Sequence, residues 1–266
     1  MSWKIFSDCR DNVPNSYGGW SIGGESLLHG YSIQRELVGK LSWMQSMIFS
    51  ATGKVPPENH AHLIEAMFIV TSYPDPRLWC NRVAALAGTA RVPAMSALSV
   101  GIASSEARLY NGQATYAATS IIKKAKLILD DGGEEALENY IISTLKRDRH
   151  IPGFGRPLTS KEERIEPVEI EAKKLGVEAG DYLATMRLIE GALRRFRLTL
   201  NYAGYAGARL LDMGFNQNEI LVIITLCLYN GMIPCYLDSY KNDPNTFLPI
   251  ACEDILYEGV EERELP

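Results

Sequence analysis

Hydrophobic residues recur at the spacing of an α-helix along most of this chain, and the strict alternation typical of a half-buried strand is nearly absent. The periodicity predicts helical segments over residues 34–52, 59–72, 78–90, 95–109, 113–130, 134–146, 162–175, 181–195, 205–213 and 217–233. We therefore predict an all-α protein.

Glycine, proline and short polar residues fall between these segments, as expected for helix ends. In "DDGGEE" the two glycines end one helix, and the glutamates that follow complement the positive N-terminus of the next. In "MGFNQNE" we expect Gly214 to end a helix and Asn216 to cap the next one ahead of Glu219. The glycine-rich lead-in over 15–26 is predicted to be flexible or rich in turns, with its Trp and Tyr packed on other residues.

Composition narrows the class of protein. The chain has 266 residues of which 46% are hydrophobic, so it can bury a large core in one or two domains. Its net charge of -5 and its lack of long Lys/Arg runs favour neither a nucleic acid nor an anionic membrane as a partner.

We find no uninterrupted apolar run of the roughly 18 residues that span a bilayer, and no signal-peptide pattern in "MSWKIFSDCRDNV", so we expect a cytoplasmic protein. The five cysteines are odd in number and show no CxxC spacing, which predicts free thiols and neither a disulfide framework nor a metal site.

A series of longer blocks carries a resemblance to a known family. They are, in chain order, "LLHGYSIQRELVGKLSWMQSMIFSATGKVPP", "HLIEAMFIV", "MSALSVGIASSEARLYNGQA", "IPGFGRPLTSKEER", "LNYAGYAGARLLDMGF" and "LCLYNGMIPCYLD". In this order and at close to this spacing they resemble the citrate synthase family, in particular its short members related to citryl-CoA lyase domains, over about residues 28–238.

This resemblance implies a citrate synthase-like, all-α fold with a large and a small helical domain. Mapped onto this chain, the large domain would comprise 1–111 and 204–266, and the small domain 112–203. It further implies a homodimer in which a carbonyl substrate and an acyl-CoA meet in the cleft between the domains.

The family's proton-transfer groups do not match at their expected positions. In the family a carboxylate removes the proton alpha to a CoA thioester, and two histidines stabilise the enolate and polarise the carbonyl. The first histidine corresponds to Tyr110 or Asn111 in "RLYNG", the second to Arg156, and the carboxylate to Ala203 in "NYA". We therefore predict that ordinary citrate synthase activity is absent.

The pocket for the carbonyl substrate has changed as well. The family's "HADH" segment corresponds to "SYPDP", without imidazoles, and an expected arginine corresponds to Leu228. Arg164 falls one residue short of a family arginine and retains the ability to bind a carboxylate in a bidentate manner. We assign Arg164, Asn201 and Arg82 to substrate binding, which points to a carboxylate other than citrate.

The loop that approaches CoA in the family keeps its pattern in Pro152, Gly153, Phe154 and Gly155. Glycine is needed there because a Cβ would block the close approach of a ligand. Arg156 places a permanent cation after the loop, which can stabilise negative charge but cannot shuttle protons. A domain hinge would explain the same loop, and both readings stay open. Two readings also stay open for three other features. His150 either acts beside the CoA loop or has a structural role, and Glu106 is either a replacement carboxylate or a surface residue. The run "RRFR" at 194–197 either contacts CoA phosphates or only complements the dipole of its helix.

Three hypotheses follow. The first is an acyl-CoA-dependent enzyme that forms or cleaves a C–C bond, with Tyr110, Asn111 and Arg156 stabilising negative charge and an unidentified base. The second is a catalytically inactive homologue that binds a CoA thioester or a partner protein. The third is a homodimeric scaffold with no ligand in the old cleft. None of them requires a metal ion.

Overall fold

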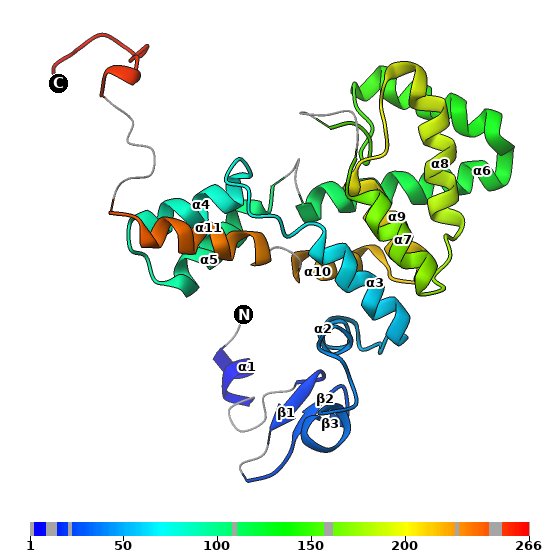
Figure 1. Ribbon diagram of the computed structural model, residues 1–266, viewed down its shortest axis with the longest axis horizontal. Coiled ribbons are helices and arrows are strands. Elements are labelled where there is room, and N and C mark those ends of the chain that lie inside the picture. Colours follow the sequence, from blue (N-terminus) through cyan, green and yellow to red (C-terminus); the bar gives the residue numbers. More distant parts are fainter. Residues whose placement is uncertain are drawn as a thin grey trace. The chain divides into compact units, whose positions relative to one another are not determined.

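A computed structural model gives the fold of the chain and describes residues 3–8, 15–20, 23–107, 111–156, 162–226, 229–244 and 252–265. The chain is predominantly helical, which confirms the predicted all-α class (Figure 1).

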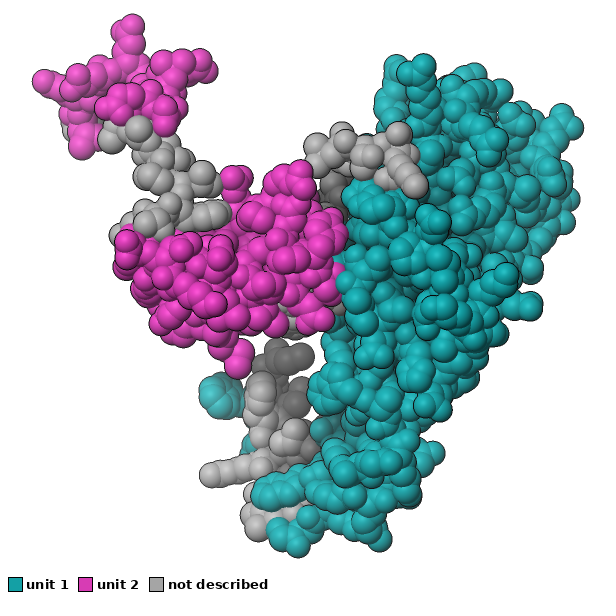
Figure 2. Space-filling view, in the orientation of Figure 1, with its two compact units in different colours: residues 1–71, 107–227 teal, residues 72–106, 228–266 magenta. Residues whose placement is uncertain are grey.

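The chain divides into two compact units. One comprises 1–71 and 107–227, and the other comprises 72–106 and 228–266 (Figure 2). These bounds differ from those of the two expected domains, because 112–203 lies in the same unit as 1–71 and 204–227. The division into a large domain and a small domain of 112–203 stays a prediction.

The first unit holds most of the helices. Its elements are α1 (Trp3–Asp8), β1 (Gly18–Trp20), β2 (Ser26–Leu28), β3 (Tyr31–Ser32), the π-helical turn η1 (Ile33–Leu37), α2 (Trp43–Thr52), α3 (Glu58–Ile69), α6 (Asn111–Asp148), α7 (Ile165–Lys174), α8 (Asp181–Leu193), the 3-10 turn η2 (Arg194–Phe196), α9 (Tyr202–Asp212) and α10 (Gln217–Thr225). Each helical segment predicted in this unit overlaps one of these helices, and α6 covers both 113–130 and 134–146, whereas α1 was not predicted.

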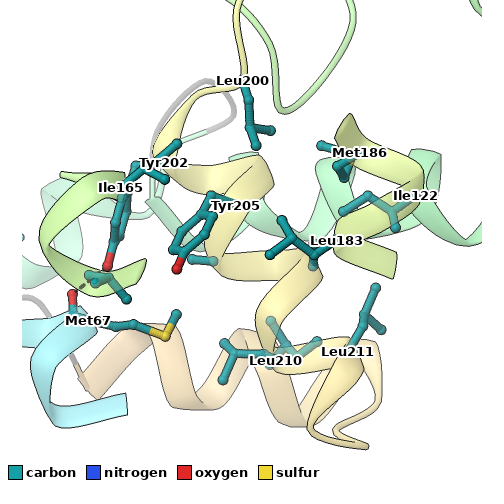
Figure 3. Close-up of a cluster of buried hydrophobic side chains, with 14 of the residues drawn as sticks. Met67, Ile122, Ile165, Leu183, Met186, Leu200, Tyr202, Tyr205, Leu210 and Leu211 are labelled. Atoms are coloured by element: carbon teal, nitrogen blue, oxygen red, sulfur yellow. Dashed lines mark hydrogen bonds between the residues drawn. The ribbon is translucent and has the colours of Figure 1, made fainter. Parts of the chain in front are cut away.

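The core of the first unit forms where α9 packs against α6, α8 and α10. Ile122, Met186, Tyr205 and Leu210 are at most 1% exposed and come from three different helices (Figure 3). The hydroxyl group of Tyr202 donates a hydrogen bond of 2.8 Å to the carbonyl oxygen of Met67, marked by the dashed line in Figure 3, and so connects α9 to α3. The burial of α9 on several sides makes its first turn a fixed support for neighbouring loops.

The helix ends confirm the predicted caps. α6 consists of two helical stretches that meet at a kink, where Gly133 has φ 73° and ψ -171°, so the glycine pair interrupts the helix as expected. Gly214 has φ +87°, a conformation that glycine adopts without a Cβ clash. The side chain of Asn216 accepts hydrogen bonds from the backbone N–H groups of 218 and 219, and the Glu219 carboxylate accepts one of 2.8 Å from the backbone N–H of Asn216. This reciprocal arrangement is a capping box.

The glycine-rich lead-in contains a small sheet that the sequence analysis did not predict. Strands β1, β2 and β3 pair antiparallel in that order, and strands of two or three residues are too short to show an alternating pattern. Tyr17 contacts the His29 ring edge-on, at 5.3 Å between centroids, although Tyr17 is 64% exposed. Trp20 is 68% exposed, so the expectation that it is packed is wrong.

The second unit consists of α4 (Trp79–Thr89), α5 (Ala94–Ser105), α11 (Tyr229–Lys241) and the short turn η4 (Cys252–Asp254). Helix α4 packs on both α5 and α11. The approach to α11 is close, since a Cβ on Gly88 would lie 2.6 Å from the carbonyl oxygen of Tyr236. Cys80 and Cys235 are buried free thiols, as predicted for these two.

Residues 217–241 correct one expectation from the sequence. This 25-residue stretch covers α10 and α11, and a window within it has a mean hydropathy of 2.0, which is long and apolar enough to cross a membrane. About half of that window (47%) is buried inside the protein, and α10 packs on α6 as the core helix of a globular unit does. Asn230, Gly231 and Pro234 interrupt the apolar run in this stretch and concealed its length.

Candidate functional site

The loop "IPGFG" lies directly on the first turn of α9. Gly153 and Gly155 have φ values of +89° and +80°, in the left-handed region that favours glycine. A Cβ on Gly153 would lie 3.1 Å from the Cα atom of Gly204, and a Cβ on Gly204 would lie 2.6 Å from the carbonyl oxygen of Gly153. Two glycines that face each other therefore set how closely the loop approaches the helix.

Asn201 fixes this loop to α9 through both ends of its amide. Its Oδ1 accepts the backbone N–H of Gly204 at 3.1 Å and caps the helix, while its Nδ2 donates to the carbonyl oxygen of Gly155 at 3.0 Å. The backbone N–H of Asn201 donates to the carbonyl oxygen of Gly153 at 2.9 Å. The backbone N–H of Gly155 donates to the carbonyl oxygen of Thr199 at 2.8 Å. Asn201 thus positions the loop, and its predicted contact with substrate stays a prediction.

Arg156 and Arg164, both predicted from the sequence, meet around two neighbouring glutamates. Arg164 donates from Nε and Nη2 to the two carboxylate oxygens of Glu162, at 2.6 and 2.8 Å. Arg156 donates to both carboxylate oxygens of Glu163, from Nη2 to Oε1 at 3.0 Å and from Nη1 to Oε2. The same Nη1 atom lies 3.7 Å from Oε1 of Glu162. We call these four residues the Arg156 cluster.

The two glutamates of the Arg156 cluster differ in burial. The side chain of Glu162 is 4% exposed, and it also accepts the backbone N–H of Tyr202 at 3.1 Å. The side chain of Glu163 is 58% exposed, while those of Arg156 and Arg164 are both 20% exposed. The guanidinium of Arg164 further lies over the Tyr202 ring, 4.8 Å from its centroid, where a cation–π interaction contributes.

The electrostatics of the Arg156 cluster are those of two matched ion pairs. Hydrogen bonds from Arg156 lower the pKa of the Glu163 carboxyl from its ordinary value of 4.5 to about 2. Two arginines and two glutamates leave the cluster without net charge at neutral pH. We assigned no role to Glu162 or Glu163 from the sequence, although their places between Arg156 and Arg164 in "RPLTSKEER" were the available signal.

Asn111 combines two unusual features at the start of α6. Its φ of 56° lies in the left-handed region, which costs free energy for a residue with a Cβ. Its Nδ2 atom is buried and has no hydrogen-bond partner among the described residues. A strained backbone beside such a buried donor makes Asn111 a candidate ligand-binding position. Its predicted neighbour Tyr110 lies outside the described residues.

The other residues predicted from the sequence are not members of the Arg156 cluster. Arg82 is exposed on α4, and Glu106 directly follows α5, both in the second unit, so their roles beside Arg156 stay predictions. Leu228 lies outside the described residues. His150 is exposed and its Nδ1 lies 3.1 Å from the carbonyl oxygen of Asp148, while Arg195 pairs with Glu138 at 3.1 Å.

Two cavities lie elsewhere in the described part of the chain. One of about 110 Å³ adjoins His60, Arg209 and Asp212, and another of about 470 Å³ adjoins Pro74, Pro234 and other residues of the second unit. Neither is lined by a member of the Arg156 cluster, so the candidate site is defined by its loop and charged groups.

The helical architecture is that of the citrate synthase-like fold. Comparison with solved structures confirms this fold. A citryl-CoA lyase from Hydrogenobacter thermophilus matches with a TM-score of 0.78 and 20% identity, over 96% of this chain and 98% of that one. An ATP citrate lyase from Methanothrix soehngenii, solved with citrate and coenzyme A, matches with a TM-score of 0.77 and 20% identity, over 98% of this chain and 45% of that one.

A citrate synthase from Thermoplasma acidophilum, solved with carboxymethyl coenzyme A and oxaloacetate, gives a TM-score of 0.60 at 16% identity, over 84% of this chain and 58% of that one. Neither protein-family models nor curated protein sequences give a match to this chain. The likeness of this chain to known proteins therefore lies in the fold, as the sequence blocks predicted.

Proposed function

We propose that this protein is an acyl-CoA-dependent enzyme of the lyase or acyltransferase type, which forms or cleaves a C–C bond in a carboxylate other than citrate. One observation carries the proposal: a glycine loop is held against α9 by two facing glycines and is followed directly by an arginine. The proposal is supported by the fold, because proteins with this fold have been solved with coenzyme A or its derivatives bound.

Pro152, Gly153, Phe154 and Gly155 are the residues that would bind the CoA thioester. The left-handed glycines keep Cβ atoms out of the way of a ligand that approaches the backbone. A Cβ on Gly155 would lie 3.1 Å from the Leu198 side chain, so the segment that follows "RRFR" runs beside the loop. The exposed arginines of 194–197 are the groups on this side that could pair with CoA phosphates.

Arg156, Asn111 and Tyr110 would bind negative charge on the substrate: Arg156 either a carboxylate or the developing oxyanion, and Asn111 and Tyr110 the oxyanion on the reacting carbonyl. A guanidinium and an amide N–H both donate hydrogen bonds to an oxyanion, and the Nδ2 of Asn111 has no partner in the part of the chain that the structure describes. Arginine keeps its proton at neutral pH, so a separate group must move protons. Ala203, at the position of the family carboxylate, is half-buried on the first turn of α9 and cannot do so.

The test is release of free CoA thiol, followed with a thiol reagent, from a panel of acyl-CoAs in the presence of small carboxylic and oxo acids. We expect turnover with at least one pair, and a loss of about a hundredfold or more in Arg156→Ala. Arg187→Ala is the matched control, because Arg187 is an exposed arginine of the same unit that pairs with Glu190 on its own helix. Turnover that survives Arg156→Ala would contradict the assigned role.

The alternative is a catalytically inactive homologue that binds a CoA thioester. The neutral charge of the Arg156 cluster favours it, since both arginines already have carboxylate partners. Thermal shift separates the two, because a ligand at 100 times its dissociation constant stabilises a protein by about 2.7 kcal/mol. Stabilisation by acyl-CoA without turnover would support the inactive homologue, and no response to any CoA species would contradict both.

The proposal includes a homodimer. Helix α5 contains no charged residue and exposes Met95 (80%) and Val100 (54%), a surface that is costly to leave in water. We expect a dimer in light scattering and a monomer for Val100→Glu. Ile170→Glu on α7 is the control because Ile170 is similarly exposed (52%), and dissociation by both variants alike would contradict an interface on α5. A cytoplasmic location also remains an expectation.

A further inference from the structure

We propose that Glu163 is an internal competitor for substrate: it occupies the guanidinium of Arg156 until a carboxylate of the substrate displaces it. This inference rests on the proposed function, because it names the step by which a carboxylate gains access to the site. Glu163 would then determine specificity without taking part in the chemistry.

The geometry shows a carboxylate already bound to Arg156. Both Nη atoms of Arg156 donate to the two oxygens of Glu163, which is the bidentate arrangement by which arginine recognises a free carboxylate. Arg156 is mostly buried, with 20% of its side chain exposed, so it would be costly to leave without a counter-charge. A substrate carboxylate can offer the same two oxygens in the same plane.

Only one of the two glutamates is free to exchange. Glu162 is 4% exposed, binds Arg164 with both oxygens and accepts the N–H of Tyr202 at the start of α9. Moving Glu162 would break its two ionic hydrogen bonds to Arg164 and its bond from the Tyr202 N–H, all at a buried position where the loss of hydrogen bonds is costly. The side chain of Glu163 is 58% exposed and can turn into water with its carboxylate hydrated.

Charge decides which ligands can replace Glu163. Once Glu163 has moved out, Arg156, Arg164 and Glu162 together carry one positive charge. A ligand with a carboxylate restores neutrality, whereas an uncharged aldehyde, amide or alcohol cannot replace the ionic hydrogen bonds that Glu163 provided. The contact thus selects ligands that present a carboxylate beside the CoA loop.

Glu163→Gln should weaken the competitor while keeping the size of the side chain. Because an exposed ion pair contributes little, we expect carboxylates such as pyruvate and malonate to bind the variant about two- to fivefold more tightly than the unmodified protein, measured by calorimetry with acetyl-CoA present. The control is Glu166→Gln, which removes the same charge from an exposed glutamate in the first turn of α7. Equal affinities in all three proteins, or weaker binding by Glu163→Gln, would overturn the proposal.

A second measurement is independent of catalysis. Phenylglyoxal reacts with accessible arginines, and mass spectrometry of the peptide that contains Arg156 reports its rate of labelling. We expect Arg156 to be labelled at least threefold faster in Glu163→Gln than in Glu166→Gln, and malonate to protect it. Faster labelling with protection, but no binding of acyl-CoA, would uphold the displacement while the proposed function fails. Turnover of acyl-CoA with unchanged labelling in Glu163→Gln would overturn the displacement alone.

Discussion

The contact between Gly153 and Gly204 should not tolerate a single added methyl group. In Gly204→Ala the new Cβ would lie 2.6 Å from the carbonyl oxygen of Gly153 and 2.8 Å from both its Cα and the Cε of Met186. Two of these three neighbours are backbone atoms, which cannot turn away as a flexible side chain can. The loop therefore has to move off α9.

The cost can be estimated from the contacts that this movement disturbs. Overpacking of a close-packed site costs about 2 kcal/mol. Displacement of the loop also weakens the two hydrogen bonds that Asn201 donates to the carbonyl groups of Gly153 and Gly155, at about 1 kcal/mol each. The better helix propensity of alanine returns about 1 kcal/mol. We expect Gly204→Ala to lower the free energy of unfolding by about 3 kcal/mol.

Urea unfolding followed by circular dichroism measures this difference, and Gly191→Ala is the matched control. Gly191 also lies in a helix, but a Cβ there meets nothing within 4 Å, so alanine should stabilise the protein by about 0.5 to 1 kcal/mol. Binding of acyl-CoA should weaken in Gly204→Ala and stay unchanged in Gly191→Ala. A Gly204→Ala protein as stable as the unmodified one would refute the close seating of the loop on α9.

Three further predictions concern charge and capping. Glu169→Gln should lower the free energy of unfolding by about 2 to 3 kcal/mol in urea titrations, because the Arg209 side chain is 3% exposed and forms an ion pair of 2.7 Å with Glu169. A loss below about 0.5 kcal/mol would contradict a buried ion pair. The lowered pKa of Glu163 means that its ion pair stabilises the protein above about pH 4.5 and is lost as the pH falls toward 2. The stability difference between the unmodified protein and Glu163→Gln, about 1 kcal/mol or less at this exposed position, should therefore vanish over that range, and a constant difference would rule the ion pair out as its source. Asn216→Ala should cost about 1 kcal/mol in thermal unfolding, through loss of the capping box of α10, and an unchanged midpoint would argue against the cap.

The sequence predicted the helices well because their signals are local. Apolar spacing located α2 to α10 but missed α1 and most of α11, and glycine and asparagine marked the ends at Gly133, Gly214 and Asn216. The small sheet of β1 to β3 was missed because its strands have only two or three residues and are held by pairing with one another. Short strands leave too little pattern to detect.

The candidate site divides in the same way. By itself the sequence determined the helical class, the glycine loop at Gly153 and Gly155, and the presence of Arg156 and Arg164 beside it, because these follow from residue type and local order. Only the tertiary structure decided that Gly153 rests on Gly204, that Asn201 holds the loop, and that each arginine is already paired with a glutamate. The physical reason is that packing and ion pairing depend on which side chains folding brings within a few ångströms of one another. Even neighbours in sequence can then differ in burial, since Glu162 is buried and Glu163 is exposed to water.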